Sequence, residues 1–450
     1  MKNVFENLLS LKELDLSFND LKQIEPRALL KLNNIILFTV KNSNFVNVLE
    51  SKMLKGLKSL SKLDISATKT TLFQNESFSG LAALTVVNHT SGQLKNIEYN
   101  AFLEIGPLEI LILCHNQLNK FHVNTSTISS VQEIYLNNNQ IQNISSEDFS
   151  NLKLLRILNL ADNEIIKLSS DEFQHLNALT HLDLSLNKNM NILGNPFQNL
   201  SRLYSLSLEN VKWSITFENS SAAIENLNMR SCSIIDVNVI NIFNVRGLSY
   251  LYLSKNQITT VNKNSFGNIT TLVILDLSFN NITYIQPGSF LNLKNLRSLD
   301  LYGNYLSFVQ FGVFDGIGLL NVLNLSSNKL SKFDAKLLPN IEYLYLDDNI
   351  ITDIHLEDFL ETSLSKLTIG GNQISCKVLA ELKVSKYSEQ FKRVITAKNL
   401  NYHTENVNGI SCQTTTSITP STSDKYISNN QGINIISNTP VLYLLFFFFF

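Results

Sequence analysis

Residues 272–290, LVILDLSFNNITYIQPGSF, contain the pattern that most of the chain repeats. Within them, apolar residues and one asparagine stand at fixed offsets: Leu272, Leu275, Leu277, Asn280, Ile282, Ile285 and Phe290. The same series begins at Leu248, 24 residues earlier, and at Leu296, 24 residues later. Self-similarity at a fixed period of this size indicates a repeat architecture in which every repeat is one structural unit.

The residue types within one repeat predict its local structure. Alternation at Leu275, Asp276 and Leu277 is strand-like, with both leucines pointing inward and Asp276 outward. Parallel copies of this strand would stack about 4.8 Å apart and form one continuous sheet. Asn280 is expected to point inward at the turn, where its amide can bond to backbone groups of its own and the adjacent coil. Because one coil cannot bury its apolar face alone, stability comes from its neighbours.

Sixteen such frames run through the chain, with starts 21 to 25 residues apart: Leu11, Ile35, Leu60, Leu84, Leu108, Val131, Leu155, Leu179, Leu203, Ile224, Leu248, Leu272, Leu296, Leu320, Ile341 and Leu364. The turn asparagine is present as Asn19, Asn116, Asn139, Asn163, Asn187, Asn256, Asn280, Asn304, Asn328, Asn349 and Asn372. Cys232 takes its place once, and Ser43, Thr68, Gly92 and Val211 are departures. Phenylalanine holds the outer position as Phe78, Phe102, Phe149, Phe173, Phe197, Phe266, Phe290, Phe314 and Phe359.

The second to fourth frames and the region around Trp213 depart most from the pattern. A lost turn asparagine removes one link between coils, so a looser or bent stack is one expectation there. Ordinary drift of the repeat is the favoured alternative to a functional break.

Across residues 11–412, the L-x-x-L-x-L-x-x-N-x-L frame with its outer phenylalanines resembles the extracellular leucine-rich-repeat family. Within that family it is similar to Toll-type receptor ectodomains and chaoptin-like adhesion proteins, and its ending resembles secreted insect immune proteins. The insect proteins carry a coiled coil after the cap, which this sequence lacks. The resemblance implies an α/β repeat solenoid, namely a horseshoe with one long concave parallel β-sheet and short 3-10 or irregular convex segments.

The unbroken repeat predicts one solenoid over residues 11–375, after a partial lead-in at residues 1–10. Residues 376–412 resemble the cysteine-bearing cap that closes such ectodomains, and residues 413–440 are expected to be a disordered Ser/Thr/Asn-rich stalk. The apolar tail at residues 441–450 is shorter than the roughly 20 residues that span a bilayer. Three interpretations stay open for it: a lipid-anchor signal, a cut transmembrane helix, or translated non-coding sequence.

The cap resemblance implies a disulfide between Cys376 and Cys412, and therefore an oxidising compartment. Two unpaired cysteines are the alternative. Cys232 is expected to be a buried turn residue. Cys114 should face the concave side, where it is a free thiol or links two chains, so a homodimer or heterodimer stays open.

Sequons for N-glycosylation also favour an extracellular or cell-surface protein, and they occur at Asn75, Asn88, Asn124, Asn143, Asn199, Asn219, Asn268, Asn281 and Asn324. The N terminus has no apolar run of signal-peptide length, so the sequence favours a missing true start. Contact with a membrane is expected only through the C-terminal tail, if at all.

Composition argues against several kinds of partner and chemistry. Charged residues make up 16% and the net charge is −2, so nothing electrostatic indicates nucleic acid or an anionic membrane. None of the seven histidines has a metal-like i, i+4 partner. Aspartates recur on the predicted strands as a solvated face. We expect no enzyme activity, no metal and no cofactor.

Binding of a protein ligand or co-receptor on the concave face is the predicted function. Tyrosines there supply large contact areas with polar tips. The predicted patch consists of Tyr250, Tyr252, Tyr302, Tyr343 and Tyr345, with the rim charges Lys255 and Asp347. Two alternatives stand beside it. Tyrosine is common in strands for structural reasons, and the chain could be an intracellular scaffold whose cysteines are reduced and whose sequons are unused.

Overall fold

The computed structural model describes residues 5, 7–21, 28–45, 47–51, 53–212, 223–240, 245, 247–263, 265–267, 269–338, 340–352, 355, 358–359, 364–400, 402 and 405–414. Contacts divide the chain into a unit of Met1–Thr414 and a unit of Thr415–Phe450. The predicted tail, the predicted stalk beyond Thr414, the region around Trp213 and the sequons at Asn219 and Asn268 lie outside the described residues.

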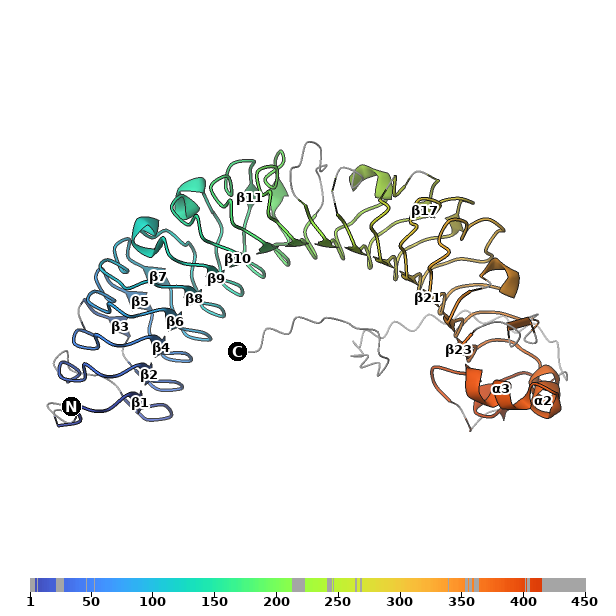
Figure 1. Ribbon diagram of the computed structural model, residues 1–450, viewed down its shortest axis with the longest axis horizontal. Coiled ribbons are helices and arrows are strands. Elements are labelled where there is room, and N and C mark those ends of the chain that lie inside the picture. The colour runs from blue at the N-terminus through green and yellow to red at the C-terminus, as the bar shows by residue number, and fades with distance from the viewer. Residues whose placement is uncertain are drawn as a thin grey trace. The chain divides into compact units, whose positions relative to one another are not determined.

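One parallel sheet runs along the inner side of the arc formed by the first unit (Figure 1). Each of the sixteen frames contributes one strand that begins two residues after the frame start: β1 (Glu13–Asp15), β2 (Leu37–Thr39), β4 (Lys62–Asp64), β6 (Val86–Asn88), β8 (Ile110–Ile112), β9 (Glu133–Tyr135), β10 (Ile157–Asn159), β12 (His181–Asp183), β14 (Ser205–Ser207), β15 (Asn226–Asn228), β16 (Tyr250–Tyr252), β18 (Ile274–Asp276), β20 (Ser298–Asp300), β21 (Val322–Asn324), β22 (Tyr343–Tyr345) and β23 (Lys366–Thr368). Neighbouring strands pair in parallel register, for example Leu251 with Leu275. The predicted solenoid with one long parallel sheet is therefore confirmed.

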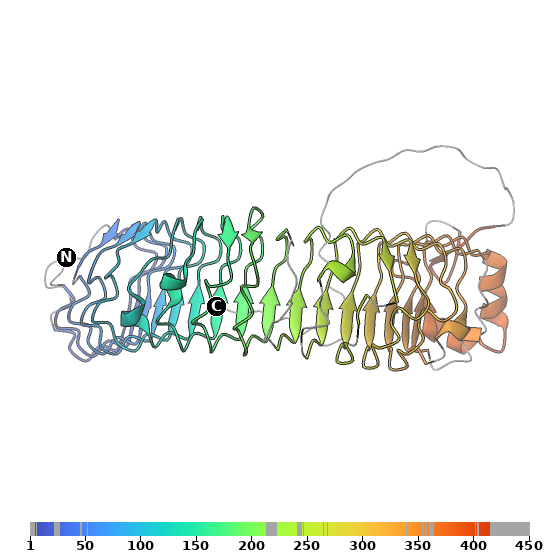
Figure 2. The ribbon, with the colours of Figure 1, turned by 90° about the horizontal axis from the view of Figure 1, so that it is seen from above.

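The outer side consists of short pieces, as Figure 2 shows from above. Among the described residues they include the 3-10 helices η1 (Thr125–Ile128), η2 (Ser146–Phe149), η3 (Val237–Ile240) and η5 (Ala335–Leu337), and the strand pairs β11 (Lys167–Leu168) with β13 (Asn191–Ile192) and β17 (Thr260–Val261) with β19 (Tyr284–Ile285). Each of these outer strands contains the apolar residue that stands thirteen positions after the start of its frame, such as Ile285 in β19.

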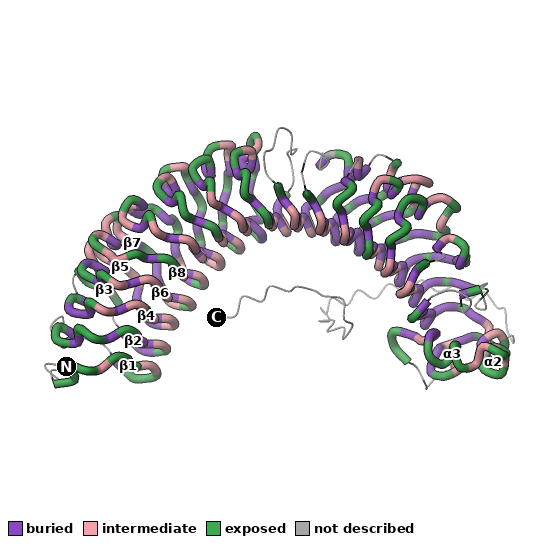
Figure 3. Tube along the Cα trace, viewed as in Figure 1, coloured by how far each residue is buried: buried purple, intermediate pink, exposed green. Residues whose placement is uncertain are grey.

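The core lies between the inner sheet and the outer pieces, where buried positions line the inside of every coil (Figure 3). Leu275 and Leu277 are fully buried on successive inward positions of β18 and its end. Outer phenylalanines of adjacent coils contact each other, with ring centroids 5.0 Å apart for Phe78 and Phe102. Burying one such side chain stabilises the fold by about 2 kcal/mol, and the contact is available only between neighbouring coils.

The turn asparagines connect each coil to the preceding one. Nδ2 of Asn280 donates to the carbonyl oxygens of Leu253 and Leu277, each at 3.0 Å, and Oδ1 accepts from the backbone N–H of Ile258 at 3.1 Å. Equivalent bonds are made by Asn116, Asn139, Asn163, Asn187, Asn256, Asn304, Asn328, Asn349 and Asn372. Asn19 is exposed and bonds only within its own coil. Cys232 donates through Sγ to the carbonyl of Leu208 at 3.0 Å.

Replacing Asn280 by alanine is expected to lower the free energy of unfolding by about 2 kcal/mol, because three buried backbone groups lose their partner. Asn281→Ala is the matched control, since its side chain is exposed at the next position. Urea unfolding of both variants tests the difference. Equal midpoints for the two variants would contradict the structural role of the ladder.

The second to fourth coils compensate for their missing asparagines, and their strands β2, β4 and β6 remain in parallel register. The hydroxyl of Thr68 donates to the carbonyl of Ile65 at 2.9 Å. On the outer side, β3 (Val48–Leu49), β5 (Leu72–Phe73) and β7 (Asn96–Ile97) form an additional sheet. The main sheet is thus continuous where the sequence pattern is weakest.

A helical cap covers the last coil. It contains α2 (Cys376–Val384), α3 (Ser388–Val394), β24 (Ile395–Thr396) and the hairpin of β25 (Asn406–Val407) and β26 (Ile410–Ser411). Leu379 and Phe391 are fully buried against the core, and a disulfide joins Cys376 to Cys412. In the part of the chain that the structure describes, every helix is too short or too polar to cross a bilayer.

Candidate partner-binding surface

Four of the predicted tyrosines project from the concave face. Tyr250 and Tyr252 flank a buried leucine on β16, and Tyr343 and Tyr345 do so on β22. Because alternate strand residues point to opposite faces, all four half-buried rings lie on the open side of the sheet. The two pairs are four strand positions apart along the sheet, about 19 Å, so they do not contact each other.

Tyr302 lies between the two pairs, two residues after β20. Its ring meets the exposed ring of Phe279 edge-on, with centroids 4.9 Å apart. Three cations hold the tyrosine rings of this surface. Arg230 lies 4.6 Å above Tyr252, and the other two contacts are Lys398 with Tyr302 at 5.0 Å and Lys366 with Tyr345 at 5.5 Å. Such contacts contribute roughly 0.5–1 kcal/mol each at exposed sites.

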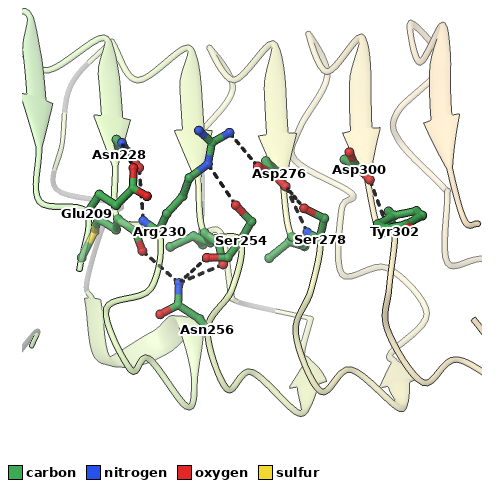
Figure 4. A network of polar contacts seen from close by, with 12 residues as sticks. Glu209, Asn228, Arg230, Ser254, Asn256, Asp276, Ser278, Asp300 and Tyr302 are labelled. Atoms are coloured by element: carbon green, nitrogen blue, oxygen red, sulfur yellow. Dashed lines mark hydrogen bonds and ion pairs between the residues drawn. The ribbon is translucent and has the colours of Figure 1, made fainter. Parts of the chain in front are cut away.

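The side chain of Arg230 is fixed by a polar network on the concave face (Figure 4). Its Nε donates to Oγ of Ser254 at 3.0 Å, and its Nη2 pairs with Oδ2 of Asp276 at 3.0 Å. Oδ1 of Asp276 accepts from the backbone N–H and the hydroxyl of Ser278. The guanidinium group is therefore held over the Tyr252 ring before any partner arrives.

The aspartates and asparagines at the strand ends have a structural role that the sequence interpretation missed. Their side chains accept the backbone N–H two residues later, as Oδ1 of Asp300 does from Tyr302 at 2.9 Å. The same bond is made by Asp15, Asp64, Asn88, Asn159, Asp183, Asn228, Asp276 and Asn324. These residues end the strands, and the recurrence of Asp or Asn four residues after the frame start is the signal that would have identified them.

Burial, and then the neighbouring charge of Asp276, raises the pKa of Asp300 to about 7. Burial also raises the pKa of Asp183, with a smaller contribution in that direction from Glu209. Two pairs of carboxyl groups on the concave face thus repel each other, Asp276 with Asp300 and Asp183 with Glu209. Arg230 forms an ion pair with Asp276.

The two predicted rim charges differ in position. Lys255 is exposed at the turn after β16, as expected, with a left-handed backbone φ of 57°. Asp347 is not on the rim, and that prediction is wrong. It is 2% exposed, and it accepts from the backbone N–H of Gly370 at 2.9 Å and of Lys398 at 2.8 Å, and from the hydroxyl of Thr368. Burial raises the pKa of Asp347, whose carboxylate joins the last coils to the cap.

An apolar part of the concave face was not predicted. It lies on β6 to β10 and consists of the half-buried residues Val86, Ile110, Ile112, Cys114, Tyr135 and Ile157. Cys114 is a free cysteine whose Sγ lies 3.4 Å from Oγ1 of Thr90. Cys232 is also free, and burial raises the pKa of its thiol to about 12.

The described sequons fall into two groups. Asn75, Asn143, Asn199 and Asn281 are exposed, whereas Asn88, Asn124 and Asn324 are half-buried. Asn88 lies on a concave strand, and its Nδ2 donates to Oδ2 of Asp64 at 3.1 Å. Within the described ranges, no three His, Cys, Asp or Glu side chains are grouped as metal ligands would be. The surface offers contact area, fixed cations and hydrogen-bonding groups.

Family models and known proteins agree with this architecture. The leucine rich repeat model matches residues 106–165, 129–188, 222–282 and 270–330. The BspA type leucine rich repeat region model, of six copies, matches residues 1–126. Together these segments cover more than half of the 450 residues.

Among curated proteins, lumican of Gallus gallus is 32% identical over 158 residues, which cover 34% of this chain and 44% of lumican. Lumican of Mus musculus is 32% identical over 162 residues, which cover 35% and 46%. The chain thus spans less than half of the length of these relatives.

Two solved structures are similar in fold. A Leptospira interrogans LRR protein superimposes with a TM-score of 0.61 at 23% identity, over 82% of this chain and 87% of the other. An internalin from Listeria monocytogenes gives a TM-score of 0.50 at 20% identity, over 81% and 87%. The repeat frame, the single parallel sheet, the asparagine ladder and the two matching repeat models together establish that this chain belongs to the leucine-rich-repeat family.

Proposed function

We propose that this chain is a non-enzymatic recognition module that holds a protein partner on the concave face between β15 and β24. The observation that carries the proposal is the row of tyrosines whose rings are held in place by cations, above all Tyr252 beneath Arg230 at 4.6 Å. Rigid aromatic side chains bury large areas at low entropic cost, and Tyr and Arg are enriched among the residues that dominate binding energy.

The proposed setting is secreted or at the cell surface, in innate immunity or cell adhesion. Three features support it: the Cys376–Cys412 disulfide, the exposed sequons Asn75, Asn143, Asn199 and Asn281, and the resemblance to Toll-type, chaoptin-like and insect immune proteins. In this proposal residues 11–375 bind, the cap at residues 376–412 protects the last coil, and residues 413–450 are the stalk and tail.

An intracellular scaffold is the second candidate, and the half-buried free Cys114 fits a reducing compartment. Treating the native protein with an N-glycosidase separates the two candidates. A shift to higher mobility supports the extracellular proposal, whereas unchanged mobility together with four free thiols supports the scaffold.

Replacing Tyr250, Tyr252, Tyr343 and Tyr345 together by alanine is expected to weaken partner binding at least tenfold without unfolding the chain. The matched control replaces four tyrosines off the concave strands, Tyr99, Tyr284, Tyr305 and Tyr402. The measurement is titration calorimetry with the first protein isolated on the immobilised wild-type chain, after circular dichroism has verified folding. Unchanged affinity of the concave variant would reject the patch.

A further inference from the structure

The cap covers the core at the last coil and also adds one strand, β24, to the inner sheet. Strand β24 pairs in parallel with β23, with Leu367 opposite Ile395 and Thr368 opposite Thr396. Two residues later, the backbone N–H of Lys398 donates to Oδ1 of Asp347 at 2.8 Å. The concave face therefore continues without interruption from the solenoid onto the cap.

Lys398 occupies the same place after its strand as Arg230 and Tyr302 do after theirs. The residues at this place on the three intervening strands are Ser326, Asp347 and Gly370, which are small or buried. Because nothing large stands between them, the side chain of Lys398 reaches back and its Nζ lies 5.0 Å from the centre of the Tyr302 ring.

Two positive charges near the tyrosines have no counter-charge. Lys398 is exposed and Lys366 is half-buried, and neither forms an ion pair with any residue that the structure describes. Asp347 is the carboxylate beside them, but its oxygens are buried and already accept from the backbone N–H groups of Gly370 and Lys398. The two ammonium groups without an ion pair therefore lie over Tyr345 on β22 and over Tyr302 after β20.

Carboxyl groups lie beside the Lys398 ammonium group, because the backbone N–H of Tyr302, whose ring Lys398 covers, donates to Oδ1 of Asp300. Arg230 pairs with Asp276, and Asp300 forms no ion pair with the residues that the structure describes, although the charge of Arg230 offsets part of the rise in its pKa that burial causes. Asp300 on β20 and Lys366 on β23 are three strand positions apart, about 14 Å, which an extended peptide covers in about four residues. A uniformly anionic ligand such as a sulfated polysaccharide would meet Asp300, whereas a protein segment can place its acidic residues only where the lysines are.

We propose that the concave face from β20 to β24 binds an acidic segment of the partner protein, whose carboxylates pair with Lys366 and Lys398 beside Tyr345 and Tyr302. Charge complementarity between a carboxylate and these two ammonium groups supplies orientation and specificity, and the tyrosines supply contact area. The inference rests on the proposed function and deepens it, because it makes the cap part of the binding surface and states the chemistry of the bound segment.

The test uses the full chain and two fluorescein-labelled peptides, one of alternating Glu and Tyr and one of alternating Lys and Tyr. Fluorescence polarisation at low and at physiological salt is expected to give tighter binding for the Glu-Tyr peptide, with a larger difference at low salt. The double variant Lys366→Met/Lys398→Met keeps the apolar stems over both rings and should weaken Glu-Tyr binding at least tenfold. Lys383→Met, an exposed lysine on α2, is the matched control and should leave the affinity unchanged.

Three results would overturn the inference: equal or tighter binding of the Lys-Tyr peptide, an unaffected double variant, or an equal loss in Lys383→Met. Heparin that displaces the Glu-Tyr peptide from wild type but not from the double variant would favour a polysaccharide instead, which also overturns it. The alanine variant at Tyr250, Tyr252, Tyr343 and Tyr345 separates the two proposals. If the alanine variant no longer binds the Glu-Tyr peptide while the lysine variant still binds it, only the charge inference fails. If both variants still bind the peptide, the proposed tyrosine surface fails as well.

Discussion

Replacing Cys376 and Cys412 together by serine is expected to lower the free energy of unfolding of the C-terminal region by about 4 kcal/mol. The two residues are 36 apart in sequence, and closing a loop of that length in the unfolded chain accounts for a stabilisation of this size in the chain-entropy model. The bond also holds the segment in which Gln413 pairs with the last coil, through its backbone N–H to Ile374 at 2.9 Å and its carbonyl to the N–H of Cys376 at 3.0 Å.

The loss should begin at the last coils, because each coil of a solenoid is stabilised mainly by its neighbours. Hydrogen exchange followed by mass spectrometry is the suitable measurement. In the variant, amides of residues 364–372 and 395–398 should exchange faster, while those of residues 133–159 keep their wild-type protection. Cys114→Ser is the control, since this cysteine is free and half-buried. Unchanged protection of residues 364–372 in the double variant would contradict the prediction.

The fold could be predicted from the sequence because its physical cause is local and repeated. Leu275 and Leu277 must face inward for β18 to bury its apolar side, and Asn280 must follow them to bond the turn. The inward apolar positions recur in every frame and the asparagine in eleven of the sixteen, so the sixteen predicted starts give the sixteen strands in their observed register. The short outer sheets were not predicted, although each of their strands contains the apolar residue thirteen positions after a frame start, because only some frames form a strand there.

The candidate surface was predictable only in part. Strand alternation sufficed to place Tyr250, Tyr252, Tyr343 and Tyr345 on the concave side. The prediction for Asp347 was wrong, because its carboxylate is buried where it accepts an N–H group from Lys398, which is 51 residues away in the sequence. Contacts of this kind form between the cap and the last coils, so the residue spacing within one frame cannot predict them.

The fourth coil shows a further dependence on tertiary packing. Gly92 stands where most coils have the turn asparagine, and the ring of the inward-pointing His89 fills the space. A Cβ atom at Gly92 would lie 1.8 Å from Cε1 of His89. In the sequence, His89 and Gly92 are two separate departures from the repeat pattern. In the structure they belong together, because Gly92 has no side chain and the imidazole of His89 occupies the space.

This replacement is expected to make the fold sensitive to acid. Neither ring nitrogen of His89 has a hydrogen-bond partner among the residues that the structure describes, and the ring is fully buried. Burial lowers the pKa of His89 from 6.5 to about 4, although nearby backbone carbonyl groups of His89 and Thr70 offset part of the effect. The unfolded chain binds the His89 proton more readily than the folded chain. The contribution of neutral His89 to the free energy of unfolding is therefore fully present above pH 6.5 and is lost as the pH falls toward 4. The loss reaches about 3 kcal/mol at the lower limit.

Urea unfolding of wild type and His89→Leu between pH 7.5 and pH 4 measures this contribution, since leucine is the residue that most frames have at this position. The stability difference between the two proteins should change by about 3 kcal/mol across the interval, with His89→Leu favoured at low pH. Asp300, whose pKa is raised to about 7, acts in the opposite direction, but it is present in both proteins and cancels in the difference. His175→Leu at an exposed position is the control and should keep the wild-type pH dependence. A difference that is constant with pH would show that the buried imidazole accepts its proton in the folded chain as readily as in the unfolded one.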